Sequence, residues 1–148
     1  MKKRILAKAI NLATNAHKGQ YDLGGQPYIL HPLAVMHMLG TDDEELQAIA
    51  VMHDVIEDTQ VTAHRLKYDF GFSDRVIDGV VALSKVDGQE YEDYLEQVLK
   101  NEDAIRVKMA DLKHNSQLDR LRGIKDKDIA RMGKYMKAYT RLKQALEK

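Results

Sequence analysis

Several residue types are scarce or absent in this 148-residue sequence, and each absence narrows the possibilities. There is no cysteine, which excludes disulfides and cysteine-ligated zinc, so any metal must be held by histidine and oxygen ligands. Only two prolines and nine glycines interrupt the chain, and few stretches alternate as strands do. The length suits one domain with a substantial core. We therefore expect residues 1–148 to form a single all-α domain.

An excess of charge of one sign is also lacking. The 23 Lys and Arg residues balance the 23 Asp and Glu residues, so the formal net charge is zero. This balance argues against a general binder of nucleic acid or anionic membranes, because both activities need excess positive charge. No apolar stretch reaches the roughly 18 residues of a membrane span, and Met1 to Ala16 lacks the apolar run of a signal peptide. We therefore expect a cytoplasmic protein.

The most informative stretch is V-M-H-D-V-I-E-D-T, residues 51–59. On a continuous helix, His53 and Glu57 would share a face, Asp54 and Asp58 would lie beside them, and apolar residues would fill the remaining directions. Such a helix is buried, and buried carboxylates are costly unless a cation holds them. A divalent metal bound by His53 and Asp54 is the simplest compensation. The alternative is a core histidine with capping acids.

Helical periodicity and capping signals divide the rest of the chain. Thr41 and Glu44 form a capping box that opens the helix carrying residues 51–59, and Pro32 suits the first position of the preceding helix. The other helices are expected at about 3–17, 32–38, 62–71, 73–83, 91–99, 103–122 and 127–148. An apolar stripe on the last helix either covers the core or contributes to a homo-oligomer interface. It comprises Ile129, Met132, Met136, Tyr139, Leu142 and Leu146.

Four segments, in the same order, resemble the Rel/SpoT-type (p)ppGpp hydrolases of the HD superfamily of metal-dependent phosphohydrolases. They are A-H-K-G-Q at 16–20, P-Y-I-L-H-P at 27–32, H-D-V-I-E-D-T at 53–59 and V-K-M-A-D-L-K-H-N at 107–115. The resemblance spans nearly the whole chain. It implies an HD-fold helical bundle that removes the 3′-pyrophosphate of ppGpp or pppGpp, giving GDP or GTP and pyrophosphate.

The resemblance also implies a role for individual residues. The expected metal ligands are His31, His53, Asp54 and Asp111. Two histidines and two carboxylates suit one Mn²⁺ ion, with Fe²⁺ or Co²⁺ as substitutes. Glu57 is expected to be the main acid/base and Asp58 its partner, exchanging protons with a water activated by the metal.

Contacts to a small nucleotide substrate are expected from four residues, which are Asn115, Lys18, Lys108 and Tyr94. Asn115 follows Asp111 by one helical turn and therefore faces the same cavity. Lys108 could instead brace the site, and Tyr94 could instead be part of the core. His17 either borders the site or packs behind the loop, and His37, His64 and His114 match no motif position.

The departures from the family pattern lie among the residues that read the nucleotide. Relatives carry Arg-Lys two residues after the glutamine of A-H-x-x-Q, where this chain has Asp22 and Leu23, and Leu112 replaces a further arginine. Replacing arginine by aspartate removes a stacking plane and reverses the charge. Two alternatives therefore stay open. The chain either hydrolyses another phosphorylated nucleotide, or it senses a nucleotide without turnover.

Overall fold

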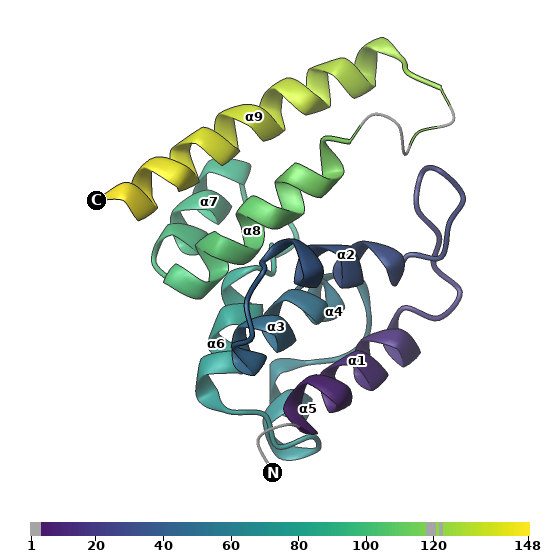
Figure 1. The fold of residues 1–148 in the computed structure, drawn as a ribbon, viewed down its shortest axis with the longest axis vertical. Coiled ribbons are helices and arrows are strands. Elements are labelled where there is room, and N and C mark those ends of the chain that lie inside the picture. Colours follow the sequence, from purple (N-terminus) through teal and green to yellow (C-terminus); the bar gives the residue numbers. More distant parts are fainter. Residues whose placement is uncertain (1–3, 118–120, 122) are drawn as a thin grey trace.

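The structure is a computed structural model that describes residues 4–117, 121 and 123–148 (Figure 1). Regular structure in these ranges is helical, with one isolated antiparallel bridge between Tyr21 and Pro27, so the all-α prediction is confirmed. The helices are α1 (Arg4–Ala16), α2 (Leu30–Met38), α3 (Glu44–Val51), α4 (Val55–Asp58), α5 (Ala63–Tyr68), α6 (Asp74–Ala82), α7 (Tyr91–Leu99), α8 (Glu102–Asn115) and α9 (Asp126–Glu147). In the described part, no helix is both long and apolar enough to cross a membrane.

Helix α3 lies at the centre of the bundle and contacts α1, α2, α6 and α8. Residues 48–51 of this helix are completely buried, which its apolar sequence predicts. Gly79 lets α6 pack closely on α3, because a Cβ atom at this position would lie 2.6 Å from Ile49 Cδ1. The long helix α9 packs across α8 and also contacts α7 at the edge of the bundle (Figure 1).

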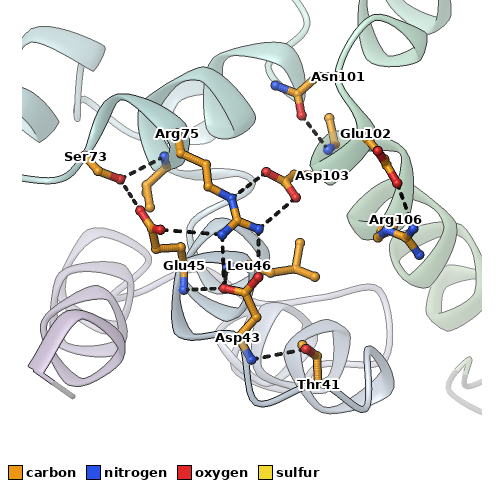
Figure 2. Close-up of polar contacts among 12 residues, drawn as sticks. Thr41, Asp43, Glu45, Leu46, Ser73, Arg75, Asn101, Glu102, Asp103 and Arg106 are labelled. Carbon is orange, nitrogen blue, oxygen red and sulfur yellow. Dashed lines mark hydrogen bonds and ion pairs between the residues drawn. The ribbon is translucent and has the colours of Figure 1, made fainter. Parts of the chain in front are cut away.

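A polar cluster ties α6 to the N-terminal ends of α3 and α8 near the surface (Figure 2). Arg75 Nη2 donates to Asp43 Oδ2 at 2.8 Å, and its Nε donates to Asp103 Oδ2 at 2.9 Å. Glu45 Oε1 lies 3.5 Å from Arg75 Nη1. We call these four residues the Arg75 cluster. The guanidinium thereby bridges three helices.

The start of α3 corrects the predicted capping box. The N-cap is Asp43, whose Oδ1 accepts hydrogen bonds from the backbone N–H groups of Glu45 and Leu46 at 3.1 and 3.3 Å. Thr41 lies outside the helix, and its Oγ1 accepts from the Asp43 N–H. An aspartate carboxylate beside the positive end of a helix is a strong cap, and Asp43 also binds Arg75.

The predicted continuous helix through residues 51–58 is wrong, because the chain turns at residues 52–54 between α3 and α4. Shorter i→i+3 hydrogen bonds replace the helical pattern, from His53 N to Ala50 O and from Val55 N to Met52 O. The His53 ring also donates to Ala50 O. The break frees His53 and Asp54 from ordinary helical geometry, which brings their side chains together.

Other helix boundaries are partly as predicted. The caps at Thr62 and Ser73 and the helix at 91–99 are confirmed. Helix α2 begins two residues before Pro32. The helix predicted at 103–122 ends at residue 115, where Ser116 Oγ donates to the carbonyl of Leu112. The predicted end residues Lys3 and Arg122 lie outside the described residues.

The apolar stripe of α9 only partly covers the core. Leu142 is completely buried, whereas Ile129 and Met136 are 60% and 63% exposed. Tyr139 and Leu146 of the stripe pack partly buried against the core, and Tyr135 and Ala138, which lie outside the stripe, join Leu142 on the inward face. The prediction that the whole stripe covers the core is therefore wrong for Ile129 and Met136, because the inward face is rotated away from them.

Candidate metal centre and active site

Three segments far apart in sequence bring the four predicted metal ligands together. His31 comes from α2, His53 and Asp54 from the turn between α3 and α4, and Asp111 from α8. His31 Nε2 lies 2.8 Å from Asp111 Oδ1, and His53 Nε2 lies 3.1 Å from Asp54 Oδ2 and 3.5 Å from Asp111 Oδ1. Both histidines and Asp111 are buried. We call these four residues the His53 cluster.

The orientation of His53 indicates that this cluster accommodates a cation. Its Nδ1 lies 2.7 Å from the carbonyl of Ala50, which can only accept, so Nδ1 carries the proton. In a neutral ring, Nε2 then points a lone pair at two carboxylate groups. This buried atom makes no well-directed hydrogen bond with any described residue. A ring nitrogen that faces carboxylate oxygens in this way fits a divalent metal, and the ligand atoms of His31, His53 and Asp54 lie within 4.8 Å of one another.

The charge balance of the cluster leads to the same conclusion. Burial acts to lower the pKa of His53, but the neighbouring charges of Asp54 and Asp111 outweigh it and raise this pKa well above its ordinary value. Burial acts to raise the pKa of Asp54, yet His53 and the Tyr28 hydroxyl lower it to about 2. The site therefore attracts positive charge, which a metal ion or a proton can supply.

Two further side chains hold Asp111 in place. Lys108 Nζ lies 2.8 Å from Asp111 Oδ2, and Asn115 Nδ2 donates to Asp111 Oδ1 at 3.0 Å. Burial opposes ionisation of Asp111, but Lys108 and the histidines hold its pKa well below the usual range. All three residues lie one turn apart on α8, so the helix presents a carboxylate that is already ionised and oriented.

Glu57 and Asp58 differ from the prediction of buried acids, because both are exposed. The break after α3 and the shortness of α4 leave them at its solvent-facing end. Glu57 Oε1 accepts a hydrogen bond from the Lys85 N–H at 2.7 Å. Desolvation and the charges of Asp54 and Glu57 raise the pKa of Asp58 to about 6, and desolvation also raises the pKa of Glu57. The carboxylate of Asp58 can therefore exchange a proton near neutral pH.

A cavity of about 280 Å³ adjoins the His53 cluster. His31 and Asn115 form part of its wall, next to the loop at 21–24. Arg131 and Tyr135 of α9 also line it, and sequence reasoning missed both. Arg131 Nη2 lies 2.7 Å from the buried carboxylate of Asp128, which orients the guanidinium. The cavity thus has a cationic group on the wall contributed by the last helix.

The loop that departs from the family pattern forms another wall of this cavity. Asp22 and Leu23 both line it. The loop is a tight hairpin in which Asp22 Oδ1 accepts from the Gln26 N–H at 2.9 Å, and the Asp22 N–H donates to Gln26 O at 2.8 Å. Leu23 is 73% exposed. The two substituted positions therefore lie where a bound molecule would meet them.

Three of the predicted substrate contacts have other surroundings. Tyr94 is buried and its hydroxyl donates to the carbonyl of Leu83 at 3.0 Å. The Lys108 ammonium, which holds Asp111, lies 5.1 Å from the centre of the Tyr94 ring. Lys18 is exposed in the turn after α1. Only Asn115 of the four predicted contacts lines the cavity of 280 Å³.

The loop motifs also orient the site, and they do so partly through Tyr28 and Gln20, to which sequence reasoning assigned no role. The Tyr28 hydroxyl donates to Asp54 Oδ2, and the ring of the buried His17 lies 5.0 Å from the Tyr28 ring. His17 Nδ1 bonds to Gln20 Oε1 at 2.8 Å, and Gln20 Nε2 donates to the carbonyl of Asp58. Tyr28 lies three residues before His31, and this spacing could have predicted that Tyr28 lies near the site.

Comparison with known proteins finds a family model and several relatives similar to this chain. A family model described as HD domain matches residues 9–132. A Haemophilus influenzae protein named guanosine-3′,5′-bis(diphosphate) 3′-pyrophosphohydrolase is 38% identical over 132 residues, covering 81% of this chain and 20% of the relative. A Vibrio cholerae protein of the same name is 41% identical over 139 residues, covering 85% of this chain and 20% of the relative. This chain thus spans about a fifth of the length of these relatives.

Two further comparisons concern SpoT proteins. The bifunctional (p)ppGpp synthase/hydrolase SpoT of Escherichia coli is 38% identical over 141 residues, covering 85% of this chain and 20% of the relative. A solved structure of a metazoan SpoT ortholog, described as hydrolysing ppGpp, superposes with a TM-score of 0.77 and 22% identity. That alignment covers 93% of this chain and 84% of the other, and it shows a shared fold. Taken with the family match over most of its length, these similarities show that the chain belongs to the HD domain family.

Proposed function

We propose that this chain is a divalent-metal-dependent phosphohydrolase that removes the 3′-pyrophosphate of (p)ppGpp, with GDP or GTP and pyrophosphate as products. The observation that carries the proposal is the buried His53 Nε2, which faces Asp54 and Asp111 beside a cavity of about 280 Å³. The names of the relatives from Haemophilus and Vibrio support the choice of substrate. We also propose one domain, a cytoplasmic location and no nucleic-acid partner, which rest on length and composition.

The proposed metal is Mn²⁺, with His31, His53, Asp54 and Asp111 as its ligands. A mixed set of imidazole and carboxylate donors without thiolate suits this ion. When bound, it would lower the pKa of a coordinated water and polarise a phosphoryl oxygen. Tyr28 orients Asp54 for this purpose, and Lys108 and Asn115 orient Asp111. Partners of this kind fix the direction in which a ligand presents its lone pairs.

Glu57 and Asp58 are the proposed acid/base groups. Hydrolysis transfers one proton from the attacking water and returns one to the departing 3′ oxygen of the ribose. Asp58, with a pKa of about 6, is suited to hold a proton for part of this cycle. Glu57 is fixed by the Lys85 N–H and lies one residue away. We assign Glu57 the main role and Asp58 that of partner.

The proposed substrate contacts begin with Asn115, which lines the cavity and touches Asp111. Arg131 supplies a guanidinium suited to phosphate, and Tyr135 supplies an aromatic face. Lys18, exposed in the turn after α1, remains a proposed phosphate contact. For Lys108 the contact with Asp111 favours bracing, and the hydrogen bond of Tyr94 to Leu83 favours a role in the core.

A second candidate function is hydrolysis of another phosphorylated nucleotide. Asp22 favours it, because a carboxylate on the cavity wall repels phosphate groups and can instead accept hydrogen bonds from a base. Exchanging the loop pair tests this directly. If ppGpp is a secondary substrate, Asp22→Arg combined with Leu23→Lys raises its kcat/KM relative to other nucleotides.

Turnover of ppGpp by the purified chain loaded with Mn²⁺ tests the proposal, with GDP and pyrophosphate as the measured products. Asp54→Ala should abolish the release. If a metal-loaded sample releases neither product from ppGpp but hydrolyses another nucleotide, the second candidate replaces the first. Tight nucleotide binding without any turnover would instead indicate a sensing module.

A further inference from the structure

Both histidines of the His53 cluster have their second ring nitrogen engaged by the protein, but by different kinds of partner. His53 Nδ1 donates to the backbone carbonyl of Ala50 at 2.7 Å. His31 Nδ1 instead lies 2.7 Å from Nδ1 of His114, a side chain on the last turn of α8. The ring centroids are 5.0 Å apart and the ring planes are inclined by 24°, so the two rings meet edge to edge.

Two ring nitrogens at hydrogen-bond distance share one proton, so one of them donates and the other accepts. His31 Nε2 points to Asp111 Oδ1 at 2.8 Å, which is the direction of the cluster. For Nε2 to offer a lone pair there, Nδ1 of His31 must carry the proton. His114 Nδ1 must then be the acceptor. The opposite arrangement would place an N–H group in the cluster and prevent His31 from binding a metal.

We propose that His114 is a positioning residue for the metal centre, which accepts the Nδ1 proton of His31 and so holds Nε2 of His31 in its metal-binding form. The inference rests on the metal centre of the proposed function. Helix α8 then contributes the ligand Asp111 and two side chains that hold Asp111 in place. It also contributes His114, which orients His31, the ligand from α2.

The geometry also identifies the variants that separate this role from simple packing. The Oδ1 atom of asparagine lies at about the same distance from the backbone as Nδ1 of histidine and can accept the same proton. Leucine has a methyl group there and cannot. His114→Asn and His114→Leu are therefore matched in position and differ in hydrogen bonding. His37→Leu, on the exposed face of α2, is the control for loss of a histidine.

The test measures Mn²⁺ affinity by titration calorimetry and the absorption spectrum of the Co²⁺-loaded protein, and neither needs a substrate. Because loss of a partner that orients a ligand weakens metal binding by about 10–100-fold, we expect a loss of this size in His114→Leu, with a changed Co²⁺ spectrum. His114→Asn and His37→Leu should bind Mn²⁺ nearly as the unmodified chain does. A ¹H–¹⁵N correlation spectrum of the Zn²⁺-loaded chain should show the His31 proton on Nδ1, independently of any variant.

Three results would overturn the inference. They are unchanged Mn²⁺ affinity in His114→Leu, an equal loss in His114→Asn and His114→Leu, and a His31 proton found on Nε2. Absence of Mn²⁺ binding by the unmodified chain is a different result. It would overturn the metal centre of the proposed function, and this inference with it.

Discussion

The Arg75 cluster and the His53 cluster both gather carboxylates around nitrogen groups, but they balance charge in opposite ways. In the Arg75 cluster a guanidinium that is always charged makes hydrogen bonds to Asp43 and Asp103, and all the groups remain partly exposed to water (Figure 2). In the His53 cluster the carboxylates of Asp54 and Asp111 face imidazoles, whose charge depends on a bound proton, and one ammonium, that of Lys108.

The difference indicates what each cluster is for. The Arg75 cluster holds three carboxylates around one guanidinium, but its side chains are partly exposed, so water solvates the excess negative charge and no further cation is needed. The charge of the His53 cluster is incomplete at a buried place, where an unbalanced carboxylate costs free energy. That cost is recovered when a cation binds. A buried cluster that needs either a proton or a metal ion in this way is suited to bind a cation.

The largest expected effect is loss of metal binding and turnover when one carboxylate of the His53 cluster is changed to an amide. The same change in the Arg75 cluster should leave metal binding intact. Asp54→Asn removes a proposed ligand while leaving an oxygen that can accept from Tyr28. We expect Mn²⁺ binding to be lost and turnover to fall by roughly a thousandfold or more, since the activation of water depends on the metal. The metal-free variant should unfold at a lower urea concentration, because the protonated imidazole of His53 loses one of its two carboxylate partners.

Asp43→Asn makes the same chemical change in the Arg75 cluster and is the control. Asparagine retains the cap of α3, so we expect a small loss of stability from the weakened contact with Arg75 and unchanged Mn²⁺ affinity. If Asp43→Asn and Asp54→Asn affected metal binding equally, the distinction between the clusters would be wrong.

A second effect concerns the stability gained on binding. Mn²⁺ at about one hundred times its dissociation constant should raise the free energy of unfolding by about 2.7 kcal/mol, and a chelator should reverse this. Urea unfolding with and without Mn²⁺ measures the difference. Asp54→Asn should show no gain. A gain that persisted in this variant would place the metal elsewhere.

Arg75→Met should have the next largest effect. It should lower the free energy of unfolding, whereas Mn²⁺ binding raises it. The change leaves the carboxylates of Asp43, Glu45 and Asp103 without their shared cation, and we expect the free energy of unfolding to fall by about 1–2 kcal/mol for a partly exposed network. Mn²⁺ affinity should stay the same. Measurement of both quantities on one sample tests the independence of the clusters, which coupled losses would contradict.

The smallest expected effect is a pH dependence arising from Asp58. Its pKa in the metal-free folded protein, about 6, is raised above the ordinary value of 3.8, so folding favours the protonated form. The stability this provides is present below about pH 4 and is lost as the pH rises through 6. Asp58→Asn stays neutral, so its stability relative to the unmodified chain should increase over this interval. Screening by water should keep the increase below about 1 kcal/mol.

Urea unfolding of the metal-free proteins at about pH 4 and pH 7 measures this change. Asp42→Asn, at an exposed neighbour of the N-cap, serves as the control for loss of one surface carboxylate. A stability difference for Asp58→Asn that did not vary with pH would mean that folding leaves this pKa unchanged.

Local patterns were sufficient to predict most of the fold. The all-α class and the caps at Thr62 and Ser73 follow from periodicity and from hydroxyl groups that accept hydrogen bonds from nearby N–H groups. The predictions failed where a distant contact decided the outcome. Asp43 displaced Thr41 as the cap of α3, and it also meets Arg75, 32 residues away. The inward face of α9, which left Ile129 exposed, was set by packing against α8.

The site shows the same division. The motifs that carry the family resemblance were sufficient to predict the four residues of the His53 cluster, because those motifs can be recognised by residue type and order along the chain. They did not identify Arg131, which reaches the cavity from α9, or the contact between His114 and His31, whose positions are separated by 83 residues.

The sequence by itself thus determined which chemical groups the protein possesses and where helices form, since both depend on residues close together along the chain. Only the tertiary structure decided which of those groups are buried and which charges lie next to one another. Burial, the helix break at residues 52–54 and the approach of α8 leave His53 Nε2 facing two carboxylates, and they expose Glu57 and Asp58 beside it. These features arise because desolvation and Coulomb interactions depend on distances in space, which the order of residues does not specify.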